Sequence, residues 1–200
     1  MNDIRLTTVP FPFALHGVPG APPRVDGDRL ELRAGQENDW FIDPGGRPPV
    51  DNAPAVLGRP DGDFQLSAHV EAELAATFDA GALVLRAGDR AWAKLALERS
   101  PEGRATVVSV VTRDRSDDCN SFAVDGPSQL LRVARIGEAC AFHVSTDGSR
   151  WQLIRHFSIA GWEPLDVGFL AQSPTGAGCT ARFADVRYAA ETLSDLRDGS

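Results

Sequence analysis

The chain has 200 residues, with 20 lysines and arginines against 28 aspartates and glutamates, so its formal net charge is −8. This acidic balance argues against a nucleic-acid-binding protein, which carries a basic stripe, and against attachment to anionic membranes. The hydrophobic fraction of 42% is typical of a globular protein with a substantial core.

The cysteines and the N-terminal segment make a cytoplasmic protein the default expectation. Cys119, Cys140 and Cys179 form no C-x-x-C pair, so we expect neither a disulfide framework nor a metal site. The first residues carry Asp3 and two prolines and do not resemble a signal peptide. No run of 18 apolar residues occurs, so no transmembrane helix is predicted, and no motif suggests a cofactor.

The whole chain has 19 glycines and 14 prolines, which divide it into short alternating segments, a pattern typical of all-β proteins. Residues 7–15 contain Pro10 and Pro12 and suit a sheet edge. Strands are predicted over 29–33, 39–42 and 64–74, with a Pro/Gly loop over 45–54. In 64–74 the apolar residues occupy every second position, from Phe64 to Leu74.

The second half continues the same pattern, with strands predicted over 80–86, 91–98, 105–113, 129–136, 139–145, 151–157, 165–172 and 180–188. Only the tail, 189–200, is expected to be helical or frayed. About eleven strands with one apolar face each must pair into two stacked sheets. We expect one domain over residues 1–200, with its core over roughly residues 10–190, because no linker divides the pattern.

Two polar segments are expected to form turns. Asp147-Gly148 lies between two predicted strands, and Asp-Gly is a strong hairpin signal because glycine accepts positive φ. The acidic stretch from Asp114 to Asp118 is interpreted as a solvated turn. Its oxygens could hold a cation, although it lacks the regular spacing of a dedicated calcium loop.

Several phrases of the sequence, in order, resemble one known family. They include Asn38-Asp39-Trp40-Phe41, Phe78 to Arg86, Trp92 to Glu98, and Ser145 to Gly148 followed by Trp151. The family is named after a "regulation of enolase" protein and belongs to the concanavalin A-like lectin/glucanase superfamily. The resemblance implies a jelly-roll sandwich of two curved antiparallel sheets, but no particular chemistry.

The search for catalytic motifs favours a protein that is not an enzyme. Nucleotide-binding, zinc-protease and serine-hydrolase motifs are absent. Hydrolases of the resembled superfamily carry an E-x-D-x-x-E strand, and Glu71-Ala-Glu73 is the nearest segment here. Glu98 stands alone on its strand, so it is the candidate catalytic residue only if another strand supplies a second carboxyl.

The strand 91–98 suggests a ligand-binding face. Ala93, Leu95 and Leu97 form an apolar side that belongs to the core, so Trp92, Lys94 and Glu98 must point the other way. A tryptophan beside charged groups is a plausible sugar-stacking surface. Further candidate ligand-binding residues, taken from neighbouring strands and loops, are Asp39, Trp40, Arg86, Arg113, Asp117, Arg132 and His143.

Three functions remain open. The preferred one is a non-catalytic domain that binds a glycan or another polyhydroxylated or anionic small molecule. The second is a glycan-active hydrolase or lyase that uses Glu98. The third, suggested by the name of the resembled family, is a regulatory protein-interaction domain.

Overall fold

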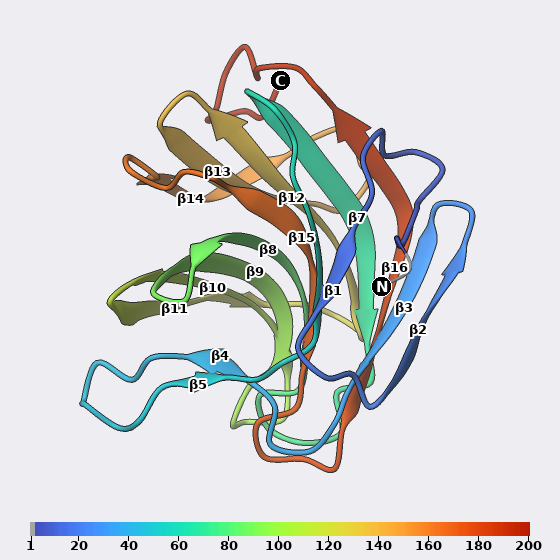
Figure 1. Cartoon of the computed structure of the whole chain (residues 1–200), viewed down its shortest axis with the longest axis vertical. Helices are drawn as coiled ribbons and strands as arrows, with labels where there is room; N and C mark the ends of the chain where they lie inside the picture. Colours follow the sequence, from blue (N-terminus) through green and yellow to red (C-terminus); the bar gives the residue numbers. More distant parts are fainter. Residues whose placement is uncertain (1–2) are drawn as a thin grey trace.

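The structure, a computed structural model, describes residues 3–200, which form two seven-stranded antiparallel sheets and one short ribbon (Figure 1). The predicted fold class is confirmed: the chain is all-β, a concanavalin A-like jelly-roll sandwich of two curved sheets. Within residues 3–200 there is no helix that could span a membrane.

The first sheet has the strand order β1-β6-β15-β8-β9-β10-β11. All its pairings are antiparallel, and its strand order brings strands distant in sequence, such as β6 and β15, side by side. In sheet order its strands are β1 (Ala14–His16), β6 (Ala55–Gly58), β15 (Asp166–Gln172), β8 (Ala80–Gly88), β9 (Ala91–Arg99), β10 (Ala105–Arg113) and β11 (Arg115–Ala123).

The second sheet has the order β14-β13-β12-β7-β16-β3-β2. Its strands are β14 (Gln152–Ser158), β13 (Ala139–Ser145), β12 (Ser128–Ile136), β7 (Phe64–Ala72), β16 (Cys179–Ala189), β3 (Arg29–Ala34) and β2 (Ala21–Asp26). The remaining ribbon pairs β4 (Trp40–Phe41) with β5 (Val50–Asp51).

The core between the two sheets follows from the two-residue period of the strands. In β7 every second side chain, from Phe64 to Ala72, is buried against the other sheet. Phe169 of β15 and Phe183 of β16 meet across the sandwich, with ring centroids 4.9 Å apart. Leu95 and Leu97 belong to this core, as the alternation in β9 predicts.

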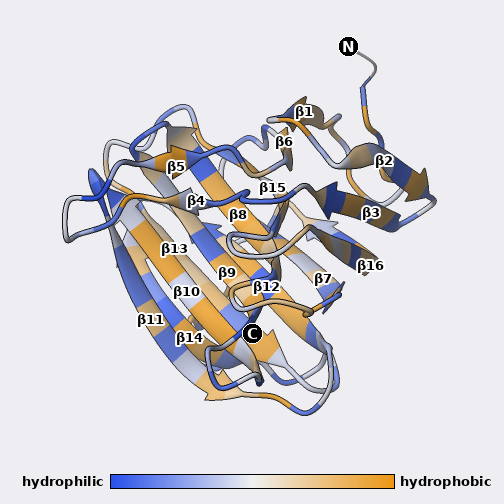
Figure 2. Ribbon diagram, turned by 90° about the horizontal axis from the view of Figure 1, so that it is seen from below, coloured by the Kyte–Doolittle hydropathy of each residue, from blue (hydrophilic) through white to orange (hydrophobic). Residues whose placement is uncertain are grey.

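A second apolar cluster lies on the other face of the first sheet. There β8, β9 and β10 are buried on both sides, because the β4–β5 ribbon passes over them (Figures 1 and 2). Trp40 and Ile42 from the ribbon segment pack against Trp92, Ala96 and Val110. The ribbon turns a sheet face that would otherwise be solvated into a second core.

The structure differs from the predicted elements in a few places. The loop expected over 45–54 contains β5, and 7–15 contributes only its last residues to β1. Strands β2, β6 and β11 were not predicted, because they carry prolines, are short, or lack an apolar alternation. The interpretation of 114–118 as a solvated turn is wrong: Asp114 turns the chain, with φ 62°, and the next residues begin β11. The tail after Ala189 forms turns and no helix.

Candidate functional site

Trp92 is not the exposed sugar-stacking surface that its position on β9 suggested. The side chain does point away from the core between the sheets, but it is 0% exposed because the ribbon covers it. The Trp40 ring lies over it, with centroids 6.0 Å apart. Trp92 is therefore a core residue of the second cluster, a correction that follows from a segment 52 residues earlier in the chain.

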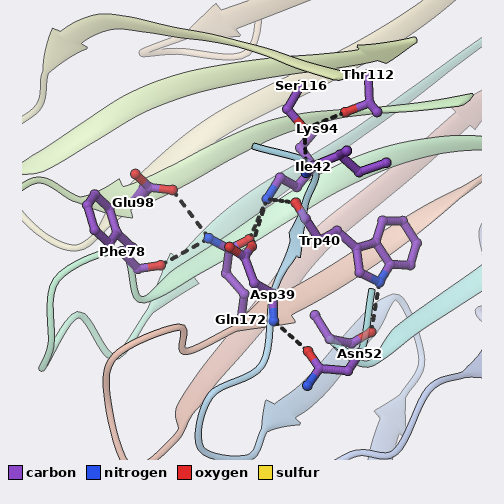
Figure 3. Close-up of polar contacts among 11 residues, drawn as sticks. Asp39, Trp40, Ile42, Asn52, Phe78, Lys94, Glu98, Thr112, Ser116 and Gln172 are labelled. Atoms are coloured by element: carbon purple, nitrogen blue, oxygen red, sulfur yellow. Dashed lines mark hydrogen bonds and ion pairs between the residues drawn. The ribbon is translucent and has the colours of Figure 1, made fainter. Parts of the chain in front are cut away.

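The buried ammonium group of Lys94 links the β4–β5 ribbon to the first sheet by hydrogen bonds. Its Nζ donates to the Trp40 carbonyl oxygen at 2.8 Å, to Gln172 Oε1 at 2.7 Å and to Asp39 Oδ1 at 3.2 Å (Figure 3). These bonds occupy all the donors of an ammonium group. Lys94 is 2% exposed, so its main role is to stabilise the floor of the site and not to contact a ligand.

Glu98 lies one step farther along the same face and contacts the same glutamine. Gln172 and Glu98 both pair with Ala80, whose small side chain lets them meet above it. Gln172 Nε2 donates to Glu98 Oε2 at 3.3 Å and to the Phe78 carbonyl oxygen at 3.0 Å (Figure 3). Burial raises the pKa of Glu98 to about 8, with Lys94 opposing and Asp118 and Asp39 reinforcing the shift. At neutral pH the Glu98 carboxyl is therefore mostly protonated.

These groups surround a pocket of about 330 Å³ between the ribbon and the first sheet. Asp39, the partner of Lys94, also lines the pocket. Asp118, paired with Val110 of β10, adds a third carboxyl, and burial raises its pKa as well. The rings of Phe41 and Phe78 supply apolar walls. The pocket thus combines the largely desolvated Glu98 carboxyl, the more exposed Asp118 carboxyl, an amide and aromatic faces, the mixture typical of small-ligand sites.

Phe78 is held in a backbone conformation that bulky residues rarely adopt. Its φ is 69°, in the left-handed region, and its side chain is 38% exposed at the pocket. The neighbouring Asp79 fixes the loop: its carboxylate accepts bonds from the backbone N–H groups of Ala75 and Ala76 and from the Ser173 hydroxyl. Such strain is concentrated at functional sites.

Arg86 and Trp40 lie at the other end of the ribbon and are structural. The Arg86 guanidinium forms two parallel bonds to Asp51 of β5, at 2.8 and 3.1 Å, and stacks over the Trp40 ring at 4.5 Å. It also bonds Asp89. Arg86 therefore lies on the same sheet face as Glu98, as predicted, but its N–H donors bond the ribbon residue Asp51.

Four candidate residues lie away from this pocket. Arg113 and Asp117 are on the other face of their strands, at the edge between the sheets, where Arg113 bonds the Ser158 carbonyl and Asp117 accepts a bond from Arg155. Arg132 and His143 are paired neighbours on the outer face of the second sheet. Alternation gives the face of a residue within a strand, but not which sheet the strand joins.

The sequence interpretation missed Asp118, Gln172 and Phe78. Asp118 was placed in a turn because β11 is an edge strand that is polar on both faces. Gln172 is the last residue of β15, where its even spacing from Leu170 puts it on the site face. Among residues 3–200, no group of three or more His, Cys, Asp or Glu side chains is placed to hold a metal ion.

Comparisons with known proteins show which family and which solved structures this chain is similar to. A family model described as "protein of unknown function (DUF1349)" matches residues 19–191. None of the curated protein sequences matches the chain. A functionally unknown protein from Saccharomyces cerevisiae has the same fold, with TM-score 0.80 and 20% identity over 90% of this chain and 96% of that one.

Two further similar structures are much longer than this chain. A GH43 protein from Bacillus licheniformis matches with TM-score 0.66 and 16% identity, over 83% of this chain and 34% of that one. A xylan β-1,4-xylosidase from Bacillus halodurans matches with TM-score 0.67 and 15% identity, over 82% and 33%. This chain spans about a third of these proteins, and at such identities the likeness shows the fold alone.

Proposed function

The chain belongs to the DUF1349 family, and we propose that it is a non-catalytic binding domain for a sugar or a similar polyhydroxylated small molecule. The ligand would occupy the pocket between the β4–β5 ribbon and the first sheet. One observation carries this proposal: aromatic rings and two carboxyls of raised pKa line the same pocket.

The chemistry of the lining suits a ring that carries hydroxyl groups. A protonated Glu98 both donates and accepts hydrogen bonds, and Asp118 adds a further carboxyl. The Phe41 and Phe78 rings offer apolar surface to the C–H face of a sugar. The volume of about 330 Å³ suits one or two sugar units more than a long chain.

Calorimetric titration with a panel of mono- and oligosaccharides tests the proposal. The panel includes xylo-oligosaccharides, because one similar structure is a xylan β-1,4-xylosidase. Phe78→Ala should weaken binding of the sugar found by about tenfold, since stacking is lost. Phe122→Ala is the matched control, because Phe122 has nearly the same exposure and lies outside the pocket. Absence of binding by the wild type, or equal affinity of the two variants, would refute the proposal.

A glycan hydrolase or lyase is the second candidate, favoured by the raised pKa of Glu98 and by Asp118 in the same pocket. Glu98 would act as general acid and Asp118 as the second carboxyl. The wild type would then release new reducing or unsaturated ends from the panel, and Glu98→Gln and Asp118→Asn would both abolish this release. That result would show that the protein is an enzyme and that the binding-domain proposal is wrong.

We also propose a narrower family assignment and a cellular location for the protein. The sequence phrases support membership of the group named after a "regulation of enolase" protein, and with it a third candidate, a regulatory protein-interaction domain. A sedimentation experiment with purified enolase tests it, and co-sedimentation would support it. The free cysteines Cys119, Cys140 and Cys179 support a cytoplasmic location.

A further inference from the structure

A hollow of about 400 Å³ lies on the outer face of the second sheet, the face that does not contact the first sheet. Its floor is formed by Ser67 of β7, Leu130 of β12 and Arg187 of β16. Ser67 and Arg187 are paired neighbours, and both alternate with residues that face the core. The turn between β13 and β14 forms a wall, which ends in Trp151.

Trp151 is held in place by a buried cation behind its ring. The Arg132 guanidinium carbon lies 4.3 Å from the ring centroid, and the guanidinium is fixed by Gln65 Oε1 at 3.2 Å and the Gly199 carbonyl at 2.7 Å. In residues 3–200 Arg132 has no carboxylate partner, and burial lowers its pKa to about 10. Arg132 therefore serves as a rigid support for the indole.

A β-bulge brings two charged side chains to the same hollow. The pairing of β16 with β7 shifts between Ala184 and Arg187, and Asp185 takes a φ of 50° there. Bulges of this kind re-aim side chains and occur near functional sites. Asp185 and Arg187 both line the hollow, yet they form no ion pair with each other or with any other of residues 3–200.

We propose that this hollow is a second saccharide site, independent of the pocket at Glu98. A pyranose ring would stack on Trp151, whose orientation Arg132 fixes. The free Arg187 guanidinium would donate to its hydroxyl oxygens, and the free Asp185 carboxylate would accept from its hydroxyl groups. An aromatic face beside an unpaired donor and an unpaired acceptor matches the two kinds of surface that a sugar presents.

Intrinsic fluorescence can report on this site when the wild type is compared with Trp151→Phe. Trp40, Trp92 and Trp162 are at most 5% exposed, whereas Trp151 is half-buried. Titration with cellotetraose and with maltotetraose should change the tryptophan emission of the full chain for at least one of them. Trp151→Phe should abolish the emission change while calorimetry still detects binding, because a phenyl ring also stacks.

Variants separate the contributions of the residues. Trp151→Ala and Arg187→Ala should each weaken binding by about tenfold, since each removes a main contact. Arg29→Ala is the matched control on the same sheet, and it should bind as the wild type does. Phe78→Ala should also leave this binding unchanged, so that failure here is distinguishable from failure of the proposed pocket at Glu98.

Urea unfolding of each variant confirms that it is folded before binding is measured. The proposal is overturned if neither tetrasaccharide changes the emission at concentrations on the order of 10 mM, the weak end for a specific sugar site. It is also overturned if Trp151→Ala, folded, binds the tetrasaccharide as tightly as the wild type does.

Discussion

At the scale of single residues, the chain places small side chains where nothing larger fits. A methyl group added at Gly168 of β15 would overlap the Val56 carbonyl oxygen of the neighbouring strand. At Gly81 of β8, an added Cβ would lie 2.9 Å from Ala181 and 3.0 Å from Val70, both on the opposite sheet. These glycines set how closely strands and sheets approach one another.

Gly168→Ala should therefore destabilise the protein by at least about 2 kcal/mol, because the backbone must shift to admit the methyl group. Gly88→Ala is the matched control, since no atom lies within 4 Å of the added Cβ there. Urea unfolding midpoints measure both variants. Equal midpoints would mean that β15 and β6 separate without significant cost.

Gly148→Ala probes the turn between β13 and β14. Gly148 has a φ of 75°, as the Asp-Gly signal predicted, and its N–H bonds the Ser145 hydroxyl oxygen at 2.9 Å. Alanine in that conformation should cost about 1 kcal/mol in unfolding free energy. The added methyl group meets only Leu130, at 3.8 Å, so a larger loss would point to a cause other than backbone conformation.

Glu98 should make stability depend on pH. Its pKa is about 8 in the folded protein and near the ordinary value of about 4.5 when unfolded, so the folded state binds the extra proton. The stabilisation is complete below the unfolded pKa and is lost as pH rises through about 8. Thermal melts from pH 5 to 8 should show a steeper decline for the wild type than for Glu98→Gln. Parallel curves would mean that Glu98 is already ionised.

At the scale of secondary-structure elements, the alternation of apolar residues predicted the long strands well. Strands β7, β9, β10 and β13 lie within a residue or two of their predicted bounds, because each carries an apolar face. The ribbon was predicted only as a short strand over 39–42. What it covers could not be predicted, since the contact of Trp40 with Trp92 depends on the tertiary path of a Pro/Gly-rich loop.

The same limit explains why only part of the candidate site could be predicted from the sequence. The face shared by Trp92, Lys94 and Glu98 followed from the period of β9 and is present in the structure. How deeply each of these side chains is buried could not be predicted from the period of β9. Arg132 and His143 were grouped with that face because the pattern within a strand carries no information about its sheet partner.

Lys94→Met should loosen the ribbon more than the rest of the fold. The change leaves Asp39, the Trp40 carbonyl and Gln172 without their shared donor, a loss of about 3–5 kcal/mol for a buried ion pair that loses one partner. Hydrogen exchange should accelerate most over residues 39–53. Uniform acceleration across both sheets would show that the ribbon is not a separate unit of local stability.

At the scale of the whole molecule, two apolar clusters share the central strands of the first sheet. Strands β8, β9 and β10 contribute one face to the core between the sheets and the other to the cluster under the ribbon. Neither cluster can be disrupted completely without exposing the strands of the other.

Denaturant unfolding should therefore be a single transition by two probes. Far-UV circular dichroism follows the sheets, and tryptophan emission in a Trp151→Phe background follows the buried indoles. The two midpoints should coincide, as two-state unfolding requires. An emission change that precedes the loss of circular dichroism would identify a state in which the ribbon has detached and the sandwich persists.

The links of Lys94 to Asp39 and to Gln172 cross long distances along the chain: 55 residues on one side and 78 on the other. During synthesis, Asp39 and Lys94 therefore leave the ribosome well before Gln172, the second side-chain partner of Lys94, exists. The pocket is one of the last features to be assembled, once β15 inserts between β6 and β8. A nascent chain that ends before residue 172 would contain most of the first sheet and still lack a completed pocket.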